Sequence, residues 1–183
     1  LGDILIRYVS GELHANIKAV IANHEILKDL VEKFDIPFIC ISHEGVDRDT
    51  HEMQMIETID QFDPEIIVLA KYMRILNATF VDHFKDKILN IHHSFLPAFI
   101  GANPYKQAWE RGVKIIGATA HYVTSDLDEG PIISQDIVRV DHTYAWEDMR
   151  DAGRNVEKVV LSNALNLLLN DKVFVYGNKT VVL

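Results

Sequence analysis

The chain of 183 residues contains a single cysteine, Cys40, so no disulfide can form within it. A chain without disulfides suits a reducing compartment, and we expect a cytoplasmic protein. Cys40 follows Ile39 inside an apolar run, which predicts a buried structural thiol rather than a nucleophile.

Long apolar runs are also missing. No stretch reaches the roughly 18 apolar residues that a membrane-spanning helix needs. The N-terminal stretch LGDILIRYVSGEL contains an acid and lacks a small-residue cleavage pattern. We therefore expect neither a membrane partner nor a signal peptide.

Positive charge is scarce: 18 Lys and Arg against 27 Asp and Glu give a formal net charge of −9. Broad nucleic-acid binding needs a basic surface, so no nucleic-acid partner is expected. A small anionic ligand needs only one or two local arginines and is compatible with this charge. The glycine-rich motifs GxGxxG and GxxxxGK[ST] are absent, which argues against a dinucleotide or nucleoside triphosphate site.

The sequence does contain short apolar runs that alternate with helical periodicity, as expected of an α/β protein with a doubly wound, mostly parallel sheet. Strands are predicted at residues 17–22, 38–41, 66–70, 88–92, 115–123, 132–140, 173–176 and 180–183. Helices are predicted before Gly11, at residues 26–34, 47–61, 78–84 and 145–170, and from Asn103 onwards, where Asn103 caps and Pro104 opens the helix. No repeat or linker divides the chain, so one compact domain is expected. Such domains normally open with a strand, whereas this chain opens with a helix. Either the first strand is missing from this chain or the sheet starts differently, and we expect the former, with the natural protein continuing before Leu1.

The side chains best suited to catalysis are concentrated in residues 90–97, NIHHSFLP. Strand alternation places Asn90 and His92 on one side and Ile91 on the other. They stand at the carboxyl end of a strand, where open α/β sheets bind ligands. An amide donor beside an imidazole suits acyl chemistry, since the amide can stabilise an oxyanion and the imidazole can move protons. The alternative is two polar residues that merely satisfy the end of a strand.

A second polar cluster is the stretch HYVTSDLDEGP at residues 121–131, which the pair Gly130-Pro131 closes with a turn. An acid fixed beside His92 could orient the imidazole and raise its basicity. Alternatively, these loop carboxylates are only solvated.

His92, His93, His121 and the acids of the loop at residues 124–131 are the candidate ligands for a metal ion. Adjacent histidines on a strand face opposite ways, and no HExxH or cysteine-containing metal spacing occurs, so no metal is predicted. The other histidines are interpreted as singly scattered surface or structural residues: His14, His24, His43, His51, His83 and His142.

The stretch KYMRIL at residues 71–76 follows the apolar run 66–70, again at the carboxyl end of a strand. Its apolar residues could cap the core. The same residues could also wall a flat heteroaromatic ligand, whose ring edge would bind the backbone amides.

Taken together, these motifs resemble the folate-dependent formyl-transfer superfamily. Its pattern is Asn-x-His near a strand end, Ser-x-Leu-Pro, and a later Asp-x-Gly-Pro loop, here NIH at 90–92, SFLP at 94–97 and DEGP at 128–131. Within it, the chain is most similar to the formyltetrahydrofolate deformylase family, through NIHHSFLPAFIGANPY, HYVTSDLDEGPI, VDHTY and VFVYGN. The likeness covers essentially the whole chain.

The resemblance implies a Rossmann-like formyltransferase fold, with residues 1–183 as one catalytic domain and the family's N-terminal ACT-type regulatory domain absent. It implies hydrolysis of 10-formyltetrahydrofolate to formate and tetrahydrofolate, supplying one-carbon units for purine biosynthesis, with Asn90, His92 and Asp128 catalytic. The folate is the substrate, no further cofactor is implied, and a homo-oligomer is expected. The implied substrate-binding residues are Met73, Arg74, Ile75, Leu76, His121, Val123 and Thr124.

Two alternatives stay open: a formyltransferase to an amine such as glycinamide ribonucleotide, and a folate-binding fragment without turnover. The bulk of His93 and Phe95 favours water as the acceptor, because a narrow acceptor side admits water more readily than a ribonucleotide. The negative net charge points the same way.

Overall fold

The computed structural model describes residues 1–99 and 103–183. Ile100, Gly101 and Ala102, part of the motif NIHHSFLPAFIGANPY, lie outside the described residues. The described chain forms two compact units, one of Leu1–Ile67 and Met73–Lys87 and one of Val68–Tyr72 and Ile88–Leu183. The predicted α/β class is confirmed, and every helix and strand expected from the sequence is present.

The first unit contains most of the short elements. They are α1 (Gly2–Val9), β1 (Val20–Ala22), η1 (Glu25–Leu27), α2 (Lys28–Glu32), β2 (Phe38–Cys40), α3 (Arg48–Asp60) and α4 (Ala78–His83). β1 pairs with β2 in parallel, which places Val20 opposite Phe38. Both residues pack against an apolar cluster formed by Leu5, Val31 and Ile36. The helices therefore bury one face of this small parallel sheet.

The second unit contains the longer elements. They are β3 (Ile67–Leu69, whose first residue belongs to the first unit), β4 (Ile88–His92), α5 (Pro104–Arg111), β5 (Ile115–Tyr122), β6 (Ile132–Arg139), α6 (Trp146–Leu169), β7 (Val173–Tyr176) and β8 (Lys179–Val182). The sheet order is β3-β4-β5-β6, and β4–β5 and β5–β6 pair antiparallel. Strands β1 and β2 of the first unit therefore pair in parallel, whereas the pairs β4–β5 and β5–β6 of the second unit are antiparallel.

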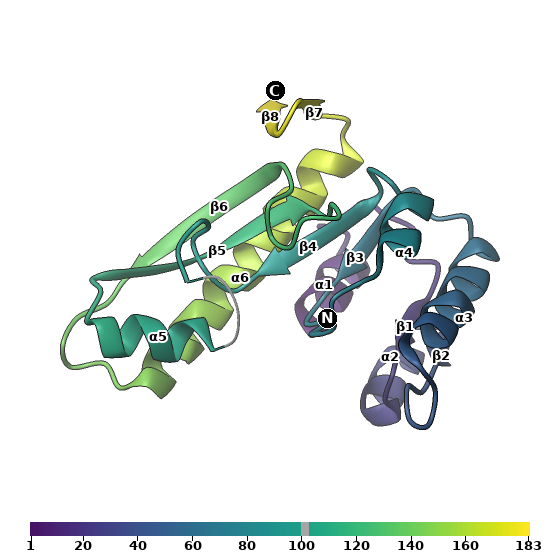
Figure 1. The fold of residues 1–183 in the computed structure, drawn as a ribbon, viewed down its shortest axis with the longest axis horizontal. Helices are drawn as coiled ribbons and strands as arrows, with labels where there is room; N and C mark the ends of the chain where they lie inside the picture. The colour runs from purple at the N-terminus through teal and green to yellow at the C-terminus, as the bar shows by residue number, and fades with distance from the viewer. Residues whose placement is uncertain (100–102) are drawn as a thin grey trace. The chain divides into compact units, whose positions relative to one another are not determined.

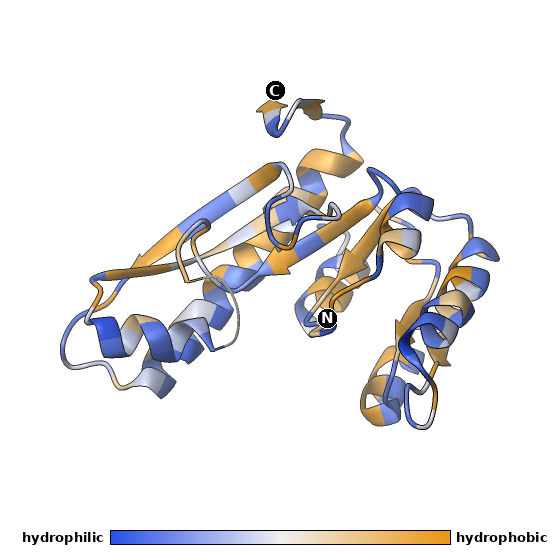
Figure 2. Ribbon diagram, viewed as in Figure 1, coloured by the Kyte–Doolittle hydropathy of each residue, from blue (hydrophilic) through white to orange (hydrophobic). Residues whose placement is uncertain are grey.

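Helix α6 is the main support of this second sheet. It packs on β4, β5, β6 and α5, and its ribbon runs behind the strands in Figure 1. Tyr105, Ala108, Ile116, Val140 and Met149 form a buried cluster that joins α5, β5 and α6. Figure 2 shows that apolar residues are concentrated on β3 and β4, whereas polar residues cover much of α5. The β7–β8 hairpin joins the sheet where the Thr180 hydroxyl donates to the Ile132 carbonyl, 2.5 Å away.

Two predictions about single residues are wrong. Cys40 is exposed, because it closes a three-residue strand and the apolar cluster beneath includes Phe38 but not the thiol. Asn103 precedes α5 as expected, yet its side chain makes no capping hydrogen bond. It adopts a left-handed backbone with φ 55°, whereas a capping side chain normally reaches the first turn from extended backbone.

The histidines of the first unit are not all singly scattered. The ring of His43 lies 5.5 Å from that of His24 and 6.2 Å from that of His51. The parallel pairing of β1 and β2 explains this, because His24 and His43 both follow the carboxyl ends of the paired strands. His51 is buried, and its Nε2 lies 3.0 Å from the carbonyl oxygen of Ile41, in keeping with the structural role expected of it.

Over the described ranges, no helix combines the length and apolar character needed to cross a membrane. Within the same ranges, no group of three or more His, Cys, Asp or Glu residues could hold a metal ion.

Candidate active site

The register between β4 and β5 brings the first polar side chains of the site together. Asn90 pairs with His121, and His92 pairs with Thr119. Directly opposite residues of antiparallel strands share a face, so Asn90 and His121 meet on the same side of the sheet as His92. The amide nitrogen of Asn90 lies 3.3 Å from Nε2 of His121.

The loop after β5 adds the acid. The Tyr122 N–H donates to the Pro131 carbonyl at 3.0 Å, which joins the two ends of the loop. A Cβ on Gly130 would overlap the carbonyl oxygen of Tyr122, so this close approach requires glycine. Asp128 adopts a left-handed backbone with φ 57°, a conformation that costs a non-glycine residue energy and that aspartate tolerates better than most. The loop therefore holds one carboxylate in a fixed position.

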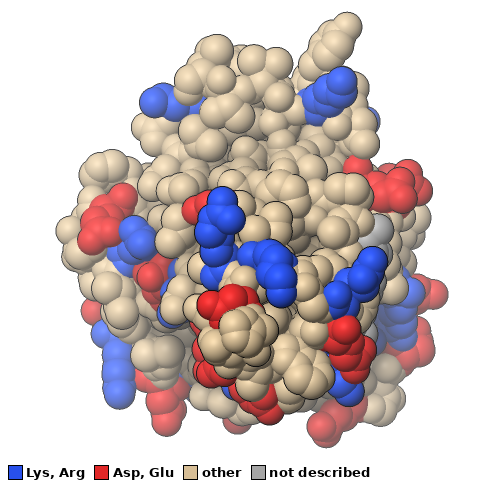
Figure 3. Space-filling model, turned by 90° about the vertical axis from the view of Figure 1, so that its left-hand side faces the viewer, with Lys and Arg blue, Asp and Glu red and all other residues tan. Residues whose placement is uncertain are grey.

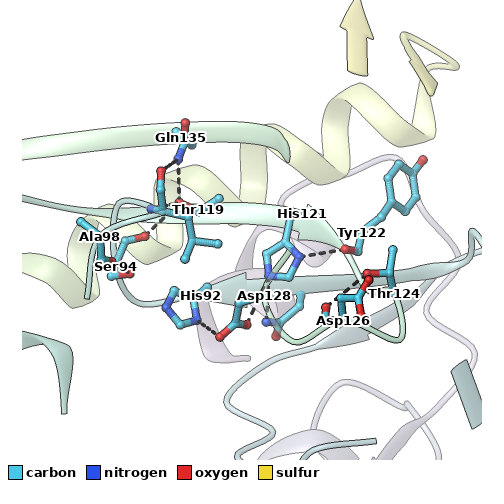
Figure 4. Close-up of polar contacts among 12 residues, drawn as sticks. His92, Ser94, Ala98, Thr119, His121, Tyr122, Thr124, Asp126, Asp128 and Gln135 are labelled. Atoms are coloured by element: carbon cyan, nitrogen blue, oxygen red, sulfur yellow. Dashed lines mark hydrogen bonds and ion pairs between the residues drawn. The ribbon is translucent and has the colours of Figure 1, made fainter. Parts of the chain in front are cut away.

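That carboxylate lies between two imidazoles, as Figure 4 shows. Its Oδ2 is 3.3 Å from Nδ1 of His92, and its Oδ1 is 3.7 Å from Nε2 of His121. The side chains of Asp128, His92 and His121 are 10%, 6% and 2% exposed. Hydrogen bonding from His121 and then from His92 lowers the pKa of Asp128 well below its usual value, against the effect of burial. The aspartate is thus ionised at neutral pH.

The two ring nitrogens of His92 differ in their surroundings. Nδ1 faces Asp128, whereas Nε2 is buried and has no hydrogen-bond partner. A buried nitrogen left without a partner is costly, and such groups are common where a substrate or water supplies the missing bond. The carboxylate fixes the ring so that Nε2 is the atom available for proton transfer.

His121 contacts both Asn90 and Asp128. Its Nδ1 lies 2.8 Å from the Tyr122 carbonyl oxygen, which can only accept, so Nδ1 carries a proton and donates. In the neutral ring Nε2 then accepts from the Asn90 amide, and in the charged ring it donates to Asp128. The sequence placed His121 among the substrate-binding residues but gave no sign of its contacts with Asn90 and Asp128, which depend on the strand register and on the loop after β5.

A second hydrogen-bond network fixes the turn that follows β4 (Figure 4). The Thr119 hydroxyl donates to the Ser94 carbonyl at 2.9 Å and accepts from the Leu96 N–H at 3.0 Å. The Gln135 amide donates to the Leu96 carbonyl at 3.1 Å and to the Thr119 hydroxyl at 2.9 Å. The sequence motif pointed to Ser94 and Leu96. It gave no signal for Thr119 and Gln135, which lie on β5 and β6.

A cleft of about 540 Å³ opens beside Asp128. The residues that line it come from the turn after β4, the Asp128 loop, the start of β6 and the β7–β8 hairpin: Leu96, Pro97, Asp128, Glu129, Gly130, Ile132, Asn178, Lys179 and Thr180. A volume of this size lies within the range of small-molecule sites.

The residues predicted to bind the folate ring divide between the two units. Met73, Arg74, Ile75 and Leu76 belong to the first unit, where the side chains of Met73 and Ile75 are 72% and 58% exposed. His121, Val123 and Thr124 belong to the second, where the Val123 N–H donates to the Ile88 carbonyl at 2.9 Å. A pocket shared by these residues stays a prediction.

The structure brings Asn90, His92 and Asp128 together within one unit, while their catalytic roles stay a prediction. A carboxylate–imidazole pair beside a carboxamide is suited to acyl transfer. Comparison with protein families agrees with this chemistry: residues 1–165 match the formyl transferase model. The chain belongs to the formyl transferase family.

The curated relatives compared by sequence share one name. A formyltetrahydrofolate deformylase from Escherichia coli K12 is 61% identical over 183 residues, which cover 100% of this chain and 65% of the relative. The deformylase from Bacillus subtilis is 51% identical over 182 residues, covering 100% of this chain and 61% of the relative. The chain thus spans less than two thirds of the length of these two relatives.

Solved structures confirm the formyltransferase fold. A deformylase from Pseudomonas syringae matches with a TM-score of 0.95 and 46% identity, over 98% of this chain and 60% of that one. A glycinamide ribonucleotide transformylase from Symbiobacterium toebii matches with a TM-score of 0.94 and 28% identity, over 100% of this chain and 87% of that one. The fold is therefore common to both named activities and does not by itself decide between them.

Proposed function

We propose that the chain carries the catalytic site of a hydrolase that converts 10-formyltetrahydrofolate and water into formate and tetrahydrofolate. One observation carries the proposal: the Asp128 carboxylate fixes His92 with its Nε2 buried and unpartnered, on the strand β4 that also carries Asn90. The relatives at 51–61% identity that are named formyltetrahydrofolate deformylase support this reaction over transfer to an amine.

In the proposed mechanism, a water at Nε2 of His92 gives its proton to that nitrogen as its oxygen attacks the formyl carbon. The Asn90 amide donates to the oxyanion of the tetrahedral intermediate. His92 then delivers the proton to the leaving nitrogen N10, the C–N10 bond breaks, and formate and tetrahydrofolate result. Every step uses groups that this chain supplies.

We infer that the stretch KYMRIL binds the pterin ring, with Arg74 lining the pocket and Met73, Ile75 and Leu76 forming its apolar walls. For the second unit, we propose that His121 and the segment from Val123 to Asp128 also contact the folate substrate. Folate titration of Arg74→Ala tests this inference: weaker binding is expected, and unchanged affinity would refute it.

The charge of the chain and the distribution of its charged side chains support water as the acceptor. A net charge of −9 disfavours polyanionic acceptors such as a ribonucleotide or tRNA. On the face drawn in Figure 3, basic and acidic side chains are interspersed rather than separated into a basic patch. We also propose a cytoplasmic homo-oligomer that supplies one-carbon units for purine biosynthesis, with the folate as substrate and no added cofactor.

The decisive assay follows formate and transferred formyl together at steady state, with and without glycinamide ribonucleotide. Equal release of formate and tetrahydrofolate in both conditions is the expected result. Formylated amine that forms faster than formate would replace the proposal with a formyltransferase, and folate binding without turnover would reduce the chain to a binding module.

A further inference from the structure

A row of polar side chains leads away from His92 and takes no part in the mechanism above. β4 ends at His92, and the ring of His93 lies 5.3 Å from the ring of His92. The ring of Tyr105, on α5, lies 6.0 Å from that of His93. The Tyr105 hydroxyl donates to Oε1 of Glu157, on α6, at 2.6 Å. The row therefore joins the candidate catalytic histidine to two helices.

The pair at the far end of the row is firmly held. Tyr105 and Glu157 are 7% and 9% exposed, and a buried carboxylate needs a donor such as this phenol. Burial and the charge of Glu157 raise the pKa of Tyr105, so the phenol keeps its proton and donates. A Cβ on Gly153 would overlap the Tyr105 ring, so glycine on α6 is what lets the ring lie against the helix. Figure 1 shows α5 beside α6 at this end of the second unit.

His93 stands between this pair and His92. Burial, followed by the charge of His92, lowers the pKa of His93, although Glu157 and Asp128 act in the opposite direction and Lys71 in the same one. The ring is therefore uncharged at neutral pH and acts by its bulk. Sequence alternation alone would turn His93 away from His92, but the strand ends first and the two rings come together.

The cavity beside the ring of His93 is small. A cavity of about 130 Å³ is lined by His93 and Tyr105 together with mostly apolar residues, among them Phe95, Ala108 and Ile116. A water molecule takes up about 30 Å³ in the liquid, so a space of this size holds water and no large ligand. Asn90, His92 and Asp128 do not line it, so it lies beside the ring of His93 rather than at the position of the nucleophile.

We propose that Tyr105 and Glu157 position the ring of His93 as a wall beside His92, and that this wall makes the site select water over an amine as formyl acceptor. The inference rests on the proposed hydrolysis and names what decides its acceptor. Both acceptors attack the same formyl carbon, the C–N10 bond breaks, and N10 takes the proton. Water yields formate and an amine yields a formamide, so only the room for the nucleophile differs.

The test measures how the formyl group divides between two acceptors. 10-Formyltetrahydrofolate is supplied with hydroxylamine or glycinamide as the amine probe, and formate, formylated amine and tetrahydrofolate are all quantified. The variants are Tyr105→Ala, which removes the support of the His93 ring, and His93→Ala, which removes that ring and leaves Tyr105 in place. Tyr105→Phe keeps the ring and loses the hydrogen bond. Trp109→Ala is the matched control, since this aromatic residue of α5 is exposed and donates instead to the Tyr144 carbonyl at 3.1 Å.

We expect the unaltered protein and Trp109→Ala to release formate equal to tetrahydrofolate. In Tyr105→Ala and His93→Ala the ratio of formylated amine to formate should be at least ten times the ratio that forms without enzyme. The increase should be smaller in Tyr105→Phe. An unchanged ratio in an active His93→Ala variant refutes the inference, whether or not Tyr105→Ala folds. Formylated amine as the main product of the unaltered protein would instead refute the proposed hydrolysis, so the two failures are distinct.

Discussion

Oδ2 of Asp128 lies 3.3 Å from Nδ1 of His92, and the opposite ring nitrogen of His92 is buried without a partner. The carboxylate thus sets both the orientation of the ring and the nitrogen that is available to the substrate. Because the pKa of Asp128 is lowered by hydrogen bonds from His121 and His92, the acid acts as a fixed negative charge rather than as a proton donor.

Replacing Asp128 by Asn should therefore lower kcat by about 10²–10⁴-fold, the usual contribution of general acid–base catalysis. The Asn side chain fits the same space but cannot stabilise the imidazolium that forms. Steady-state formate release measures the effect. Asp136→Asn is the control, because Asp136 is an exposed acid of β6 in the same unit, and equal losses in the two variants would contradict the assignment.

The lowered pKa of Asp128 also predicts how stability depends on pH. A carboxyl group whose folded pKa lies below the unfolded value of about 3.9 stabilises the fold above that pH and loses this contribution as pH falls below it. Asp128→Asn should cost about 1–3 kcal/mol at pH 7, the usual range for leaving a buried polar group without its partner. Urea unfolding of both proteins at pH 7 and at about pH 3 should show the difference shrinking in acid. A difference that stays constant would mean that the carboxylate is not stabilised by its imidazole partners.

Loss of the Asn90 amide should affect the transition state rather than binding. Asn90→Ala is expected to lower kcat by about 10²–10³-fold, as for the loss of one oxyanion donor, with little change in KM. Asn155→Ala provides the control, because Asn155 is an exposed residue of α6 that accepts a hydrogen bond from Lys158. A rise in KM at constant kcat would reassign Asn90 to substrate binding.

The close approach at Gly130 should make this glycine sensitive to the smallest side chain. In Gly130→Ala the added Cβ meets the Tyr122 carbonyl oxygen, so the loop has to shift and Asp128 moves with it. We expect a stability loss of about 1–3 kcal/mol, as for overpacking elsewhere, together with reduced formate release. Gly2→Ala should change neither, since nothing lies within 4 Å of a Cβ at that position. Thermal melts and the formate assay on both variants check the prediction.

The part of the site that the sequence could predict depends on local rules. Strand alternation placed Asn90 and His92 on one face, and the pair Gly130-Pro131 marked the turn that closes the loop carrying Asp128. Apolar periodicity located most helices and strands, because burial imposes a period of 2 or 3.6 residues on the sequence itself, and Asn103-Pro104 marked the start of α5. These features need no knowledge of which elements become neighbours.

Tertiary structure decided the contacts between distant segments. The register of β4 on β5 set Asn90 opposite His121, and helix packing joined Tyr105 to Glu157, 52 residues further along the chain. It also left Cys40 exposed although its apolar surroundings predicted burial. A periodic pattern records which face of an element is buried but not which element buries it, and register and packing follow from long-range contacts that no local pattern encodes.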